Sequence, residues 1–333
     1  MKSKPLVLIC FGTRPEWLKV KPLINKLNCK LLFTGQHQSL LNDIQFDYAV
    51  IPRSKSTRLN SIMEDCLSQF PNTRNFDYVL VQGDTATAFA CALAAFNNQT
   101  KIIHLEAGLR TNDLQNPFPE EGYRQMISRI ANIHLCPTQR SIDNLKKENL
   151  DNYYLVGNTS LDNLISLRDK CSYDNKILIT LHRRENHSLI QEWFSQIEKL
   201  AVEYSTFEFI LPIHPNPNVV KYRNLLNKVK ILEPLDHNEF LQILSQTTLC
   251  ITDSGGLQEE ASFLNKKCIV CRLSTERSEG IDSGHIVLCK NPKELPKIFK
   301  NVIQNYRIDS ESPFGIGDSS YQIQKLLETI SVN

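Results

Sequence analysis

Residues 6–16 read LVLICFGTRPE, a continuous apolar run that ends in a glycine-containing turn. The run shows no alternation of apolar and polar residues, which is typical of a parallel strand covered on both faces. Pro15 is well placed at the first position of a following helix, where its missing N–H is not needed. The segment therefore predicts a strand, a turn and a helix at the start of an α/β fold.

The same alternation of short apolar runs and helix-length segments continues along the chain. Strands are expected at 6–11, 31–33, 78–81, 101–105, 133–136, 177–181, 207–213, 229–232, 249–252 and 268–271. Helices are expected at 15–27, 85–97, 120–131, 189–204 and 257–264, among others. This order predicts parallel sheets with helices on both faces.

The chain has 333 residues, about twice the length of one usual domain. The polar stretch 168–175 interrupts the series of strands and helices near its middle. We therefore expect two similar α/β units, one on each side of this stretch. A last helix, near 322–330, is free to pack on either unit.

The composition excludes several classes of protein. Hydrophobic residues make up 41% and charged residues 22%, which indicates packed cores and not disorder. The chain has 38 basic and 36 acidic residues, so it lacks the basic excess that is typical of a DNA- or RNA-binding protein. No apolar run approaches the ~18 residues of a membrane span, and the N-terminal run is too short for a signal peptide. We expect a cytoplasmic protein with neither a nucleic acid nor a membrane as partner.

Ten cysteines are scattered through mostly apolar stretches. Outside small secreted chains, such cysteines are usually reduced thiols that pack as small core residues. Cys268 and Cys271 have the spacing of a metal or redox pair, but residues three apart on a strand point to opposite faces. The core interpretation is therefore favoured, and no metal site is expected.

Polar clusters follow many of the expected strands directly. They lie at 12–16, 82–85 and 106–110 in the first half, and at 182–186, 214–218 and 253–256 in the second. In open α/β sheets, ligands bind beyond the carboxyl ends of the strands. Each cluster therefore lies where a ligand would be.

Two of these clusters resemble anion-binding turns. Residues 12–15 (Gly-Thr-Arg-Pro) and 253–256 (Asp-Ser-Gly-Gly) each join a strand to a helix, whose free N–H groups and dipole attract an anion. Arg14 would add a charge and Ser254 a hydroxyl donor. The alternative is a tight turn capped by Ser or Thr. One such turn in each half favours a phosphate-bearing ligand held between two domains. The motifs of Walker-type NTPases and of NAD-binding folds are both absent, so these two activities lose support.

Carboxylates form the second theme. Asp84 and Glu106 each follow an apolar strand, and Glu120 opens a helical segment. With His214, they form a set suited to proton transfer beside an anion site. The alternative is that the acids cap helices and pair with arginines, and it is strongest for Glu121 and Glu259. The residues alone predict an enzyme acting on a phosphorylated, nucleotide-linked substrate.

The clusters together resemble the non-hydrolysing UDP-N-acetylglucosamine 2-epimerases. The matching segments are 12–16 (GTRPE), 35–37 (GQH), 83–85 (GDT), 104–111 (HLEAGLRT), 119–121 (PEE), 157–159 (GNT), 182–186 (HRREN), 214–218 (HPNPN), 253–261 (DSGGLQEEA) and 275–277 (TER). They occur in family order and span most of the chain.

The resemblance implies a glycosyltransferase-B-like fold, in which two Rossmann-like domains face a cleft. The domains would be 1–168, with the helix 318–333 packing back on it, and 169–317 as the UDP-binding domain. Members of the family interconvert UDP-GlcNAc and UDP-ManNAc without NAD, metal or other cofactor, by eliminating UDP and adding it again. A homodimer and a role in surface polysaccharide synthesis are expected.

The resemblance also assigns individual residues. The catalytic set would be Asp84, Glu106, Glu120 and His214. The UDP-sugar would be bound by Arg14, Ser254, Gly255, Gly256 and Arg277 at the diphosphate, by Glu260 at the ribose and by Phe240 near the uracil. A second, activating UDP-GlcNAc site, common in bacterial members, would involve Gln36, His37, Arg183, Arg184 and Glu185.

The chain departs from the family pattern at a few positions. After the PEE motif, the family usually has an asparagine directly before an arginine. This chain has Gly122 and then Tyr123 before Arg124, and Ser278 stands where a proline is usual. Gln38 replaces a common arginine, and the stretch from there to Tyr78 is shortened. Because Tyr123 sits beside a catalytic carboxylate, the identity of the hexose stays open.

Other functions remain as alternatives. A modified UDP-hexosamine, such as a deoxy or uronic acid derivative, could be the substrate. A glycosyltransferase of the same fold would not need three carboxylates. A catalytically silent sugar-nucleotide sensor would be expected to have lost part of the catalytic set, which is complete here.

Overall fold

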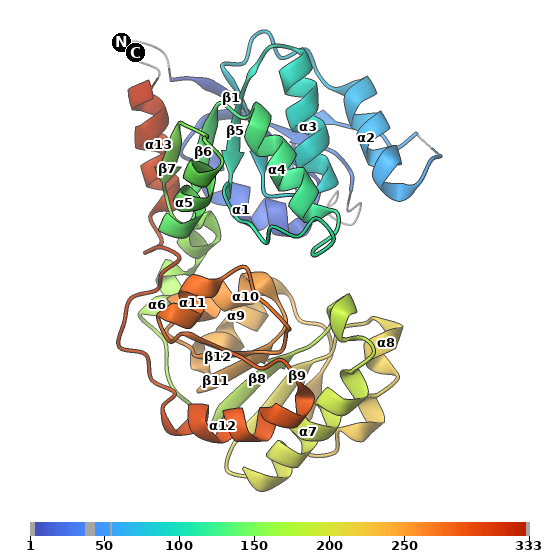
Figure 1. Ribbon diagram of the computed structural model, residues 1–333, viewed down its shortest axis with the longest axis vertical. Helices are drawn as coiled ribbons and strands as arrows, with labels where there is room; N and C mark the ends of the chain where they lie inside the picture. The colour runs from blue at the N-terminus through green and yellow to red at the C-terminus, as the bar shows by residue number, and fades with distance from the viewer. Residues whose placement is uncertain (1–3, 37–43, 54, 331–333) are drawn as a thin grey trace. The chain divides into compact units, whose positions relative to one another are not determined.

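The computed structural model describes residues 4–36, 44–53 and 55–330. The chain forms two compact units (Figure 1), Met1–Asn163 with Gly317–Asn333, and Leu164–Ile316. We call them the N-terminal and the C-terminal unit. The boundary expected after residue 168 falls at the end of the short helix α6 (Ile165–Arg168), whereas the units divide before Leu164.

The N-terminal unit is built on a parallel sheet of seven strands in the order β3-β2-β1-β4-β5-β6-β7. The strands are β1 Leu6–Phe11, β2 Asn28–Phe33, β3 Tyr48–Ala49, β4 Tyr78–Gln82, β5 Lys101–Leu105, β6 Ile133–Cys136 and β7 Tyr153–Leu155. The helices are α1 Arg14–Ile24, α2 Arg58–Gln69, α3 Ala86–Asn97, α4 Glu120–Ile130, α5 Gln139–Lys147 and α13 Ser319–Ile330.

Each face of this sheet has its own core, because successive side chains of a strand point to opposite faces. Val7 and Ile9 of β1 pack in one core with residues of α1 and α13. Leu8 and Cys10 pack in the other with residues of α2, α3 and α4. The helices cover both sides of the sheet (Figure 1), which explains why the strands are apolar throughout.

The C-terminal unit has a parallel sheet of six strands in the order β10-β9-β8-β11-β12-β13. The strands are β8 Lys176–Thr180, β9 Glu208–Pro212, β10 Lys230–Leu232, β11 Leu249–Thr252, β12 Cys268–Val270 and β13 Ile286–Leu288. Besides α6, the helices are α7 Ile190–Glu203, α8 Pro217–Val220, α9 His237–Gln246, α10 Gly255–Phe263, α11 Ser278–Asp282 and α12 Leu295–Gln304. Its largest core places Trp193 and Phe194 of α7 and Phe299 of α12 against the strands.

The α/β class with parallel sheets is confirmed in both units. Three strands of two or three residues, β3, β7 and β13, were not expected, because runs this short carry no periodicity. All ten cysteines are free thiols, and eight of them are buried, so the core interpretation is confirmed. Among the helices of the described ranges, none combines the length and the apolar character that a bilayer span requires.

Candidate active site

The N–H groups of the turn between β1 and α1 are accepted by the carboxylate of Glu16, a residue of α1. Glu16 Oε2 accepts the N–H groups of Gly12 at 3.0 Å and Thr13 at 2.7 Å, and Glu16 Oε1 accepts the hydroxyl of Thr85 at 2.6 Å. Glu16 is fully buried, and burial raises its pKa against the effect of these hydrogen bonds. The N–H groups of Gly12 and Thr13 are therefore not free to bind an anion, and the anion-binding role expected of this turn stays a prediction. Arg14, at the start of α1, is exposed.

Glu106 follows β5 and is held by two donors from other elements. Its backbone φ is +65°, an uncommon conformation for a residue with a side chain. Lys19 Nζ of α1 lies 2.5 Å from each of its carboxylate oxygens, and the amide of Gln82 also donates to it. Neither partner was foreseen. The contact with Gln82 could have been predicted from the strand register, because Gln82 pairs with Leu105, the residue directly before Glu106.

Asp84 is fixed by an arginine of α4. Arg124 Nε donates to Asp84 Oδ2 at 2.9 Å, and its Nη1 donates to Glu121 at 3.2 Å. Glu121 is fully buried and also accepts the N–H groups of Thr111 and Asn112. Burial raises the pKa of Glu121, but these contacts outweigh it and lower the pKa overall. The interpretation of Glu121 as an arginine partner is confirmed, whereas the backbone groups that it accepts belong to a loop and not to a helix terminus.

Glu120 is the first residue of α4, and its environment differs from that of the other two carboxylates. Its Oε2 is buried and has no hydrogen-bond partner among the described residues. Tyr123 stacks on Phe89 of α3, with ring centroids 5.3 Å apart and planes 11° apart. Burial and the charge of Glu120 raise the pKa of Tyr123, as expected for a tyrosine beside this carboxylate.

These contacts link the elements that carry the three carboxylates of the N-terminal unit. A Cβ on Gly83, the residue before Asp84, would lie 3.5 Å from Glu106 Oε2. Asp84 is joined by its ion pair to Arg124, which lies one helical turn from Glu120. The structure thus brings Glu106 close to Gly83, the residue before Asp84.

In the C-terminal unit, Asp253 closes a turn in the way that Glu16 does. It is fully buried and accepts the N–H groups of His182 and Arg183, both at 3.0 Å, and the side-chain amide of Asn186 at 2.9 Å. Asp253 is therefore a scaffold residue that shapes the loop after β8.

Two guanidinium groups lie close to the start of α10. Ser254 is the N-cap residue, but its side chain makes no capping hydrogen bond. A Cβ on Gly255 would lie 2.9 Å from Arg277 Nη1 and 3.2 Å from Arg183 Nη2, whereas one on Gly256 would meet no protein atom within 4 Å. A helix N-terminus, a hydroxyl that does not cap its helix and two guanidinium groups suit a phosphate. Arg183, which the resemblance assigns to a second site, lies beside Arg277 here.

Arg277 is held in place by two glutamates. Its Nε donates to Glu259 at 2.6 Å and its Nη1 to Glu276 at 2.5 Å. Glu259 is buried, which confirms its interpretation as an arginine partner. Burial alone would raise the pKa of Glu276, but Arg277 and Arg272 hold it well below its usual range.

Helix α9, which carries Phe240, contacts Glu260 of α10 through His237. His237 Nε2, at the start of α9, lies 3.5 Å from Glu260 Oε1 of α10. Phe240 is three residues beyond His237 and so lies on the same side of α9. His237 was not foreseen from the sequence.

His214 is exposed after β9, and its ring stacks on that of His182. The ring centroids are 4.8 Å apart and the planes differ by 11°. Burial lowers the pKa of both histidines, and the nearby negative charge of Asp253 opposes this effect.

Of the five residues assigned to a second site, the structure describes all except His37. Gln36 Oε1 accepts hydrogen bonds from the first turn of α3. Glu185 accepts from Arg272 at 2.6 Å, and Arg184 is exposed. His37 lies outside the described residues.

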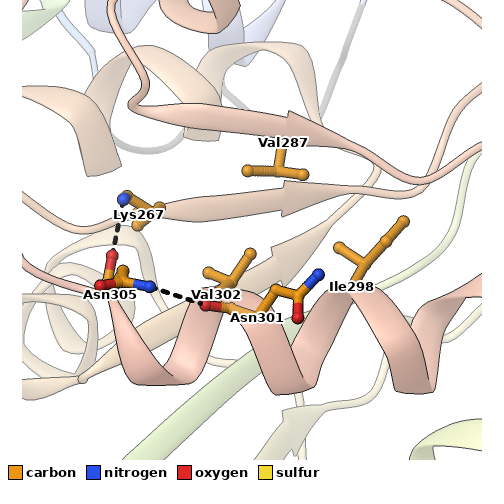
Figure 2. A pocket seen from close by; sticks show the side chains of 6 residues that line it. All are labelled: Lys267, Val287, Ile298, Asn301, Val302 and Asn305. Carbon is orange, nitrogen blue, oxygen red and sulfur yellow. Dashed lines mark hydrogen bonds between the residues drawn. The ribbon is translucent and has the colours of Figure 1, made fainter.

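A shallow hollow lies elsewhere in the C-terminal unit, between α12 and the edge of the sheet (Figure 2). It has a volume of about 270 Å³ and is lined by Lys267, Val287, Ile298, Asn301, Val302 and Asn305. Lys267 Nζ donates to the carbonyl of Asn305 at 2.6 Å across it. None of the site residues lines this hollow.

Comparisons with known proteins show which family this chain resembles along its length. A family model described as UDP-N-acetylglucosamine 2-epimerase matches residues 23–328. The UDP-N-acetylglucosamine 2-epimerase of Campylobacter jejuni is 36% identical, with 96% of this chain and 97% of the relative covered. That of Neisseria meningitidis serogroup A is 35% identical, with 96% and 98% covered.

Solved structures extend the similarity to the fold. The UDP-GlcNAc 2-epimerase from Neisseria meningitidis bound to UDP-GlcNAc has a TM-score of 0.88 and 34% identity, with 98% of this chain and 100% of that chain covered. The Methanocaldococcus jannaschii enzyme in complex with UDP-GlcNAc and UDP has a TM-score of 0.80 and 29% identity, with 97% and 99% covered. The expected glycosyltransferase-B-like fold class is thereby confirmed.

Proposed function

Because this chain belongs to the UDP-N-acetylglucosamine 2-epimerase family, we propose that it interconverts UDP-GlcNAc and UDP-ManNAc. The reaction eliminates UDP to give an enzyme-bound 2-acetamidoglucal and adds UDP again after protonation on the other face. The observation that supports the proposal is the presence of three carboxylates, Asp84, Glu106 and Glu120, each in a different environment.

Each step needs a group that this chain supplies. The proton on C2 is weakly acidic, so its removal needs a carboxylate close by. Glu120 has a buried oxygen that makes no hydrogen bond within the described part of the chain, which suits proton exchange with a substrate. Glu106 and Asp84 have their charges balanced by Lys19 and Arg124. His214 completes the catalytic set.

The departing UDP must stay bound between elimination and addition. Ser254, Gly255, Gly256 and Arg277 at the start of α10 would hold the diphosphate, and Arg14 would add a charge from the N-terminal unit. Glu260 would accept hydrogen bonds from the ribose, and Phe240 would lie against the uracil. These groups form anion and nucleoside contacts that leave the hexose free to react.

The test is epimerisation in heavy water. We expect deuterium at C2 of the recovered UDP-sugar, and a trace of glycal and free UDP after long incubation. The reaction should proceed without an added cofactor. Epimerisation with full retention of the C2 proton would overturn the elimination route, and an absence of epimerisation would overturn the assignment.

Tyr123 supports a second candidate, an epimerase of a modified UDP-hexosamine. Its buried ring lies beside Glu120, where it would contact substituents of the hexose. A panel of UDP-sugars followed by NMR distinguishes the candidates by turnover. We further propose that the enzyme works as a cytoplasmic homodimer and supplies an N-acetylmannosamine-type sugar for surface polysaccharide.

A further inference from the structure

Gln258 of α10 is fully buried, and its side-chain amide joins two segments of the C-terminal unit. Its Nε2 donates to the carbonyl of Ser254, the N-cap residue of α10, at 3.2 Å. Its Oε1 accepts the hydroxyl of Thr275, in the loop between β12 and α11, at 2.8 Å. The amide therefore links the start of the helix to a loop that follows 17 positions later.

The direction of each hydrogen bond follows from the groups involved. A backbone carbonyl can only accept, so the nitrogen of the amide must face Ser254 and its oxygen must face Thr275. Thr275 then donates its hydroxyl proton to Gln258, and the same oxygen accepts the N–H of Arg277 at 3.2 Å. One continuous chain of hydrogen bonds thus runs from the N-cap of α10 to the backbone of Arg277.

Further contacts anchor both ends of this chain. The N–H of Ser254 donates at 2.9 Å to the hydroxyl of Thr252, which is fully buried at the end of β11. Nε of Arg277 donates to Glu259, the residue after Gln258, at 2.6 Å. Two successive residues of α10 therefore hold Arg277, one through its backbone and the other through its guanidinium.

We propose that Gln258 is a positioning residue for the diphosphate: its amide fixes the spacing between Ser254, at the start of α10, and Arg277, on the loop after β12. The proposal rests on the proposed function, which takes Ser254 and Arg277 as ligands of the diphosphate. Gln258 is fully buried, so it acts through these two residues and does not itself touch UDP. Because hydrogen bonds weaken steeply with distance and angle, a loop displaced by about 1 Å would lose much of its hold on a phosphate.

Two substitutions break the chain at different points. Gln258→Met keeps the length of the side chain but removes both hydrogen bonds, and Thr275→Val keeps the branched shape but removes the hydroxyl. In each variant, the Kd for UDP should rise roughly 5- to 20-fold, whereas the Kd for uridine, which has no phosphate, should change by less than about twofold. Thr275→Ser restores the hydroxyl and should restore the affinity for UDP. Calorimetric titration measures UDP binding, and ligand-observed NMR measures uridine binding.

The double variant distinguishes positioning from direct contact with the ligand. If both residues act through one link, Gln258→Met combined with Thr275→Val should bind UDP about as tightly as the weaker single variant, because the link is already broken. Losses that add would mean that the two residues act separately, and would contradict the proposal.

Ser262→Ala is the matched control on the same helix. Ser262 is buried, and its Oγ lies 2.6 Å from Nδ1 of His285, about two turns beyond Ser254. This variant also removes a buried hydrogen bond of α10, so it should lower the stability of the unit but leave the affinity for UDP unchanged.

The readout is binding and not turnover, so a failure of this proposal can be told apart from a failure of the proposed function. Unchanged UDP affinity in Gln258→Met, an equal loss of affinity for uridine, or an equal loss in Ser262→Ala would overturn the positioning role. A wild type that binds UDP but does not epimerise UDP-GlcNAc would contradict the proposed function alone, and one that does not bind UDP would contradict both. If Gln258→Met does not fold, Thr275→Val provides the same test at a half-buried position.

Discussion

The ammonium of Lys19 lies 2.5 Å from each carboxylate oxygen of Glu106, although 87 positions separate the two residues in the sequence. Both side chains are largely buried, with 13% and 10% of their surfaces exposed. A buried ion pair of this kind holds its carboxylate in one place, and removing one partner leaves the other charge uncompensated. The pair joins helix α1 to the end of strand β5 and directs the carboxylate of Glu106.

Glu106→Gln keeps the shape of the side chain but removes its ionisable group. If Glu106 shuttles a proton, turnover should fall by roughly 10²–10⁴, while UDP affinity changes little. Steady-state kinetics and calorimetric titration with UDP measure the two effects. Glu192→Gln, at an exposed position of α7, is the control and should behave as wild type. Normal turnover of Glu106→Gln would remove Glu106 from the catalytic set.

Ser254→Ala should separate ligand binding from helix stability. Ser254 makes no capping hydrogen bond, so the free energy of unfolding should barely change. If its hydroxyl binds the diphosphate, UDP affinity should fall by roughly 5- to 30-fold, equivalent to about 1–2 kcal/mol. Thr138→Ala is the converse control, because Thr138 does cap α5 through the N–H of Ser141. This variant should lose about 1 kcal/mol of stability and keep its UDP affinity. Unchanged UDP affinity in Ser254→Ala, with a loss of stability instead, would contradict the binding role of Ser254.

Glu276→Gln should change how stability depends on pH. Burial raises the pKa of Glu276, but Arg277 and Arg272 lower it more, so the folded protein holds it well below the ordinary 4.5. A carboxylate with a depressed pKa stabilises the fold above its unfolded pKa, and this contribution is lost as the pH falls below about 4.5.

The wild type should therefore exceed Glu276→Gln in unfolding free energy by about 1.5–3 kcal/mol near neutral pH, and the difference should shrink below pH ~4.5. Urea unfolding from pH 3.5 to 7 measures it. Glu311→Gln, an exposed substitution in the same unit, should show no such difference. A difference independent of pH would mean that the charge of Glu276 does not contribute.

Activation at a second site should be weak in this protein. Gln38 stands where an arginine is common in the family, and an amide cannot replace a guanidinium as a bidentate phosphate ligand. Allosteric coupling is typically only ~1–3 kcal/mol, so one lost contact can cancel most of it. We expect near-hyperbolic kinetics and a reverse reaction from UDP-ManNAc that starts without added UDP-GlcNAc. A lag, or silence until UDP-GlcNAc is added, would show a working second site, and Gln38→Arg should introduce such behaviour.

The order of elements and most strand positions followed from local pattern. The run 6–11 is continuous and apolar because both faces of β1 are covered. Strand β5 likewise buries Ile102 on one face and Ile103 on the other. The short strands β3, β7 and β13 did not follow, because their pairing comes from neighbours and not from their own two or three residues.

The chain by itself determined the α/β class, the clusters at the ends of the strands and the family, because these depend on local periodicity and on residues adjacent in sequence. Only the tertiary structure decided which charged side chains contact each other and which backbone groups they bind. Glu16 directly follows one expected anion-binding turn and Asp253 begins the other. The carboxylate of each accepts N–H groups of its own or a neighbouring turn, since buried N–H groups must find an acceptor. The pairing of Lys19 with Glu106 and the stack of His182 on His214 depend on strand register and helix packing, which bring distant residues within a few ångströms and which no local pattern encodes.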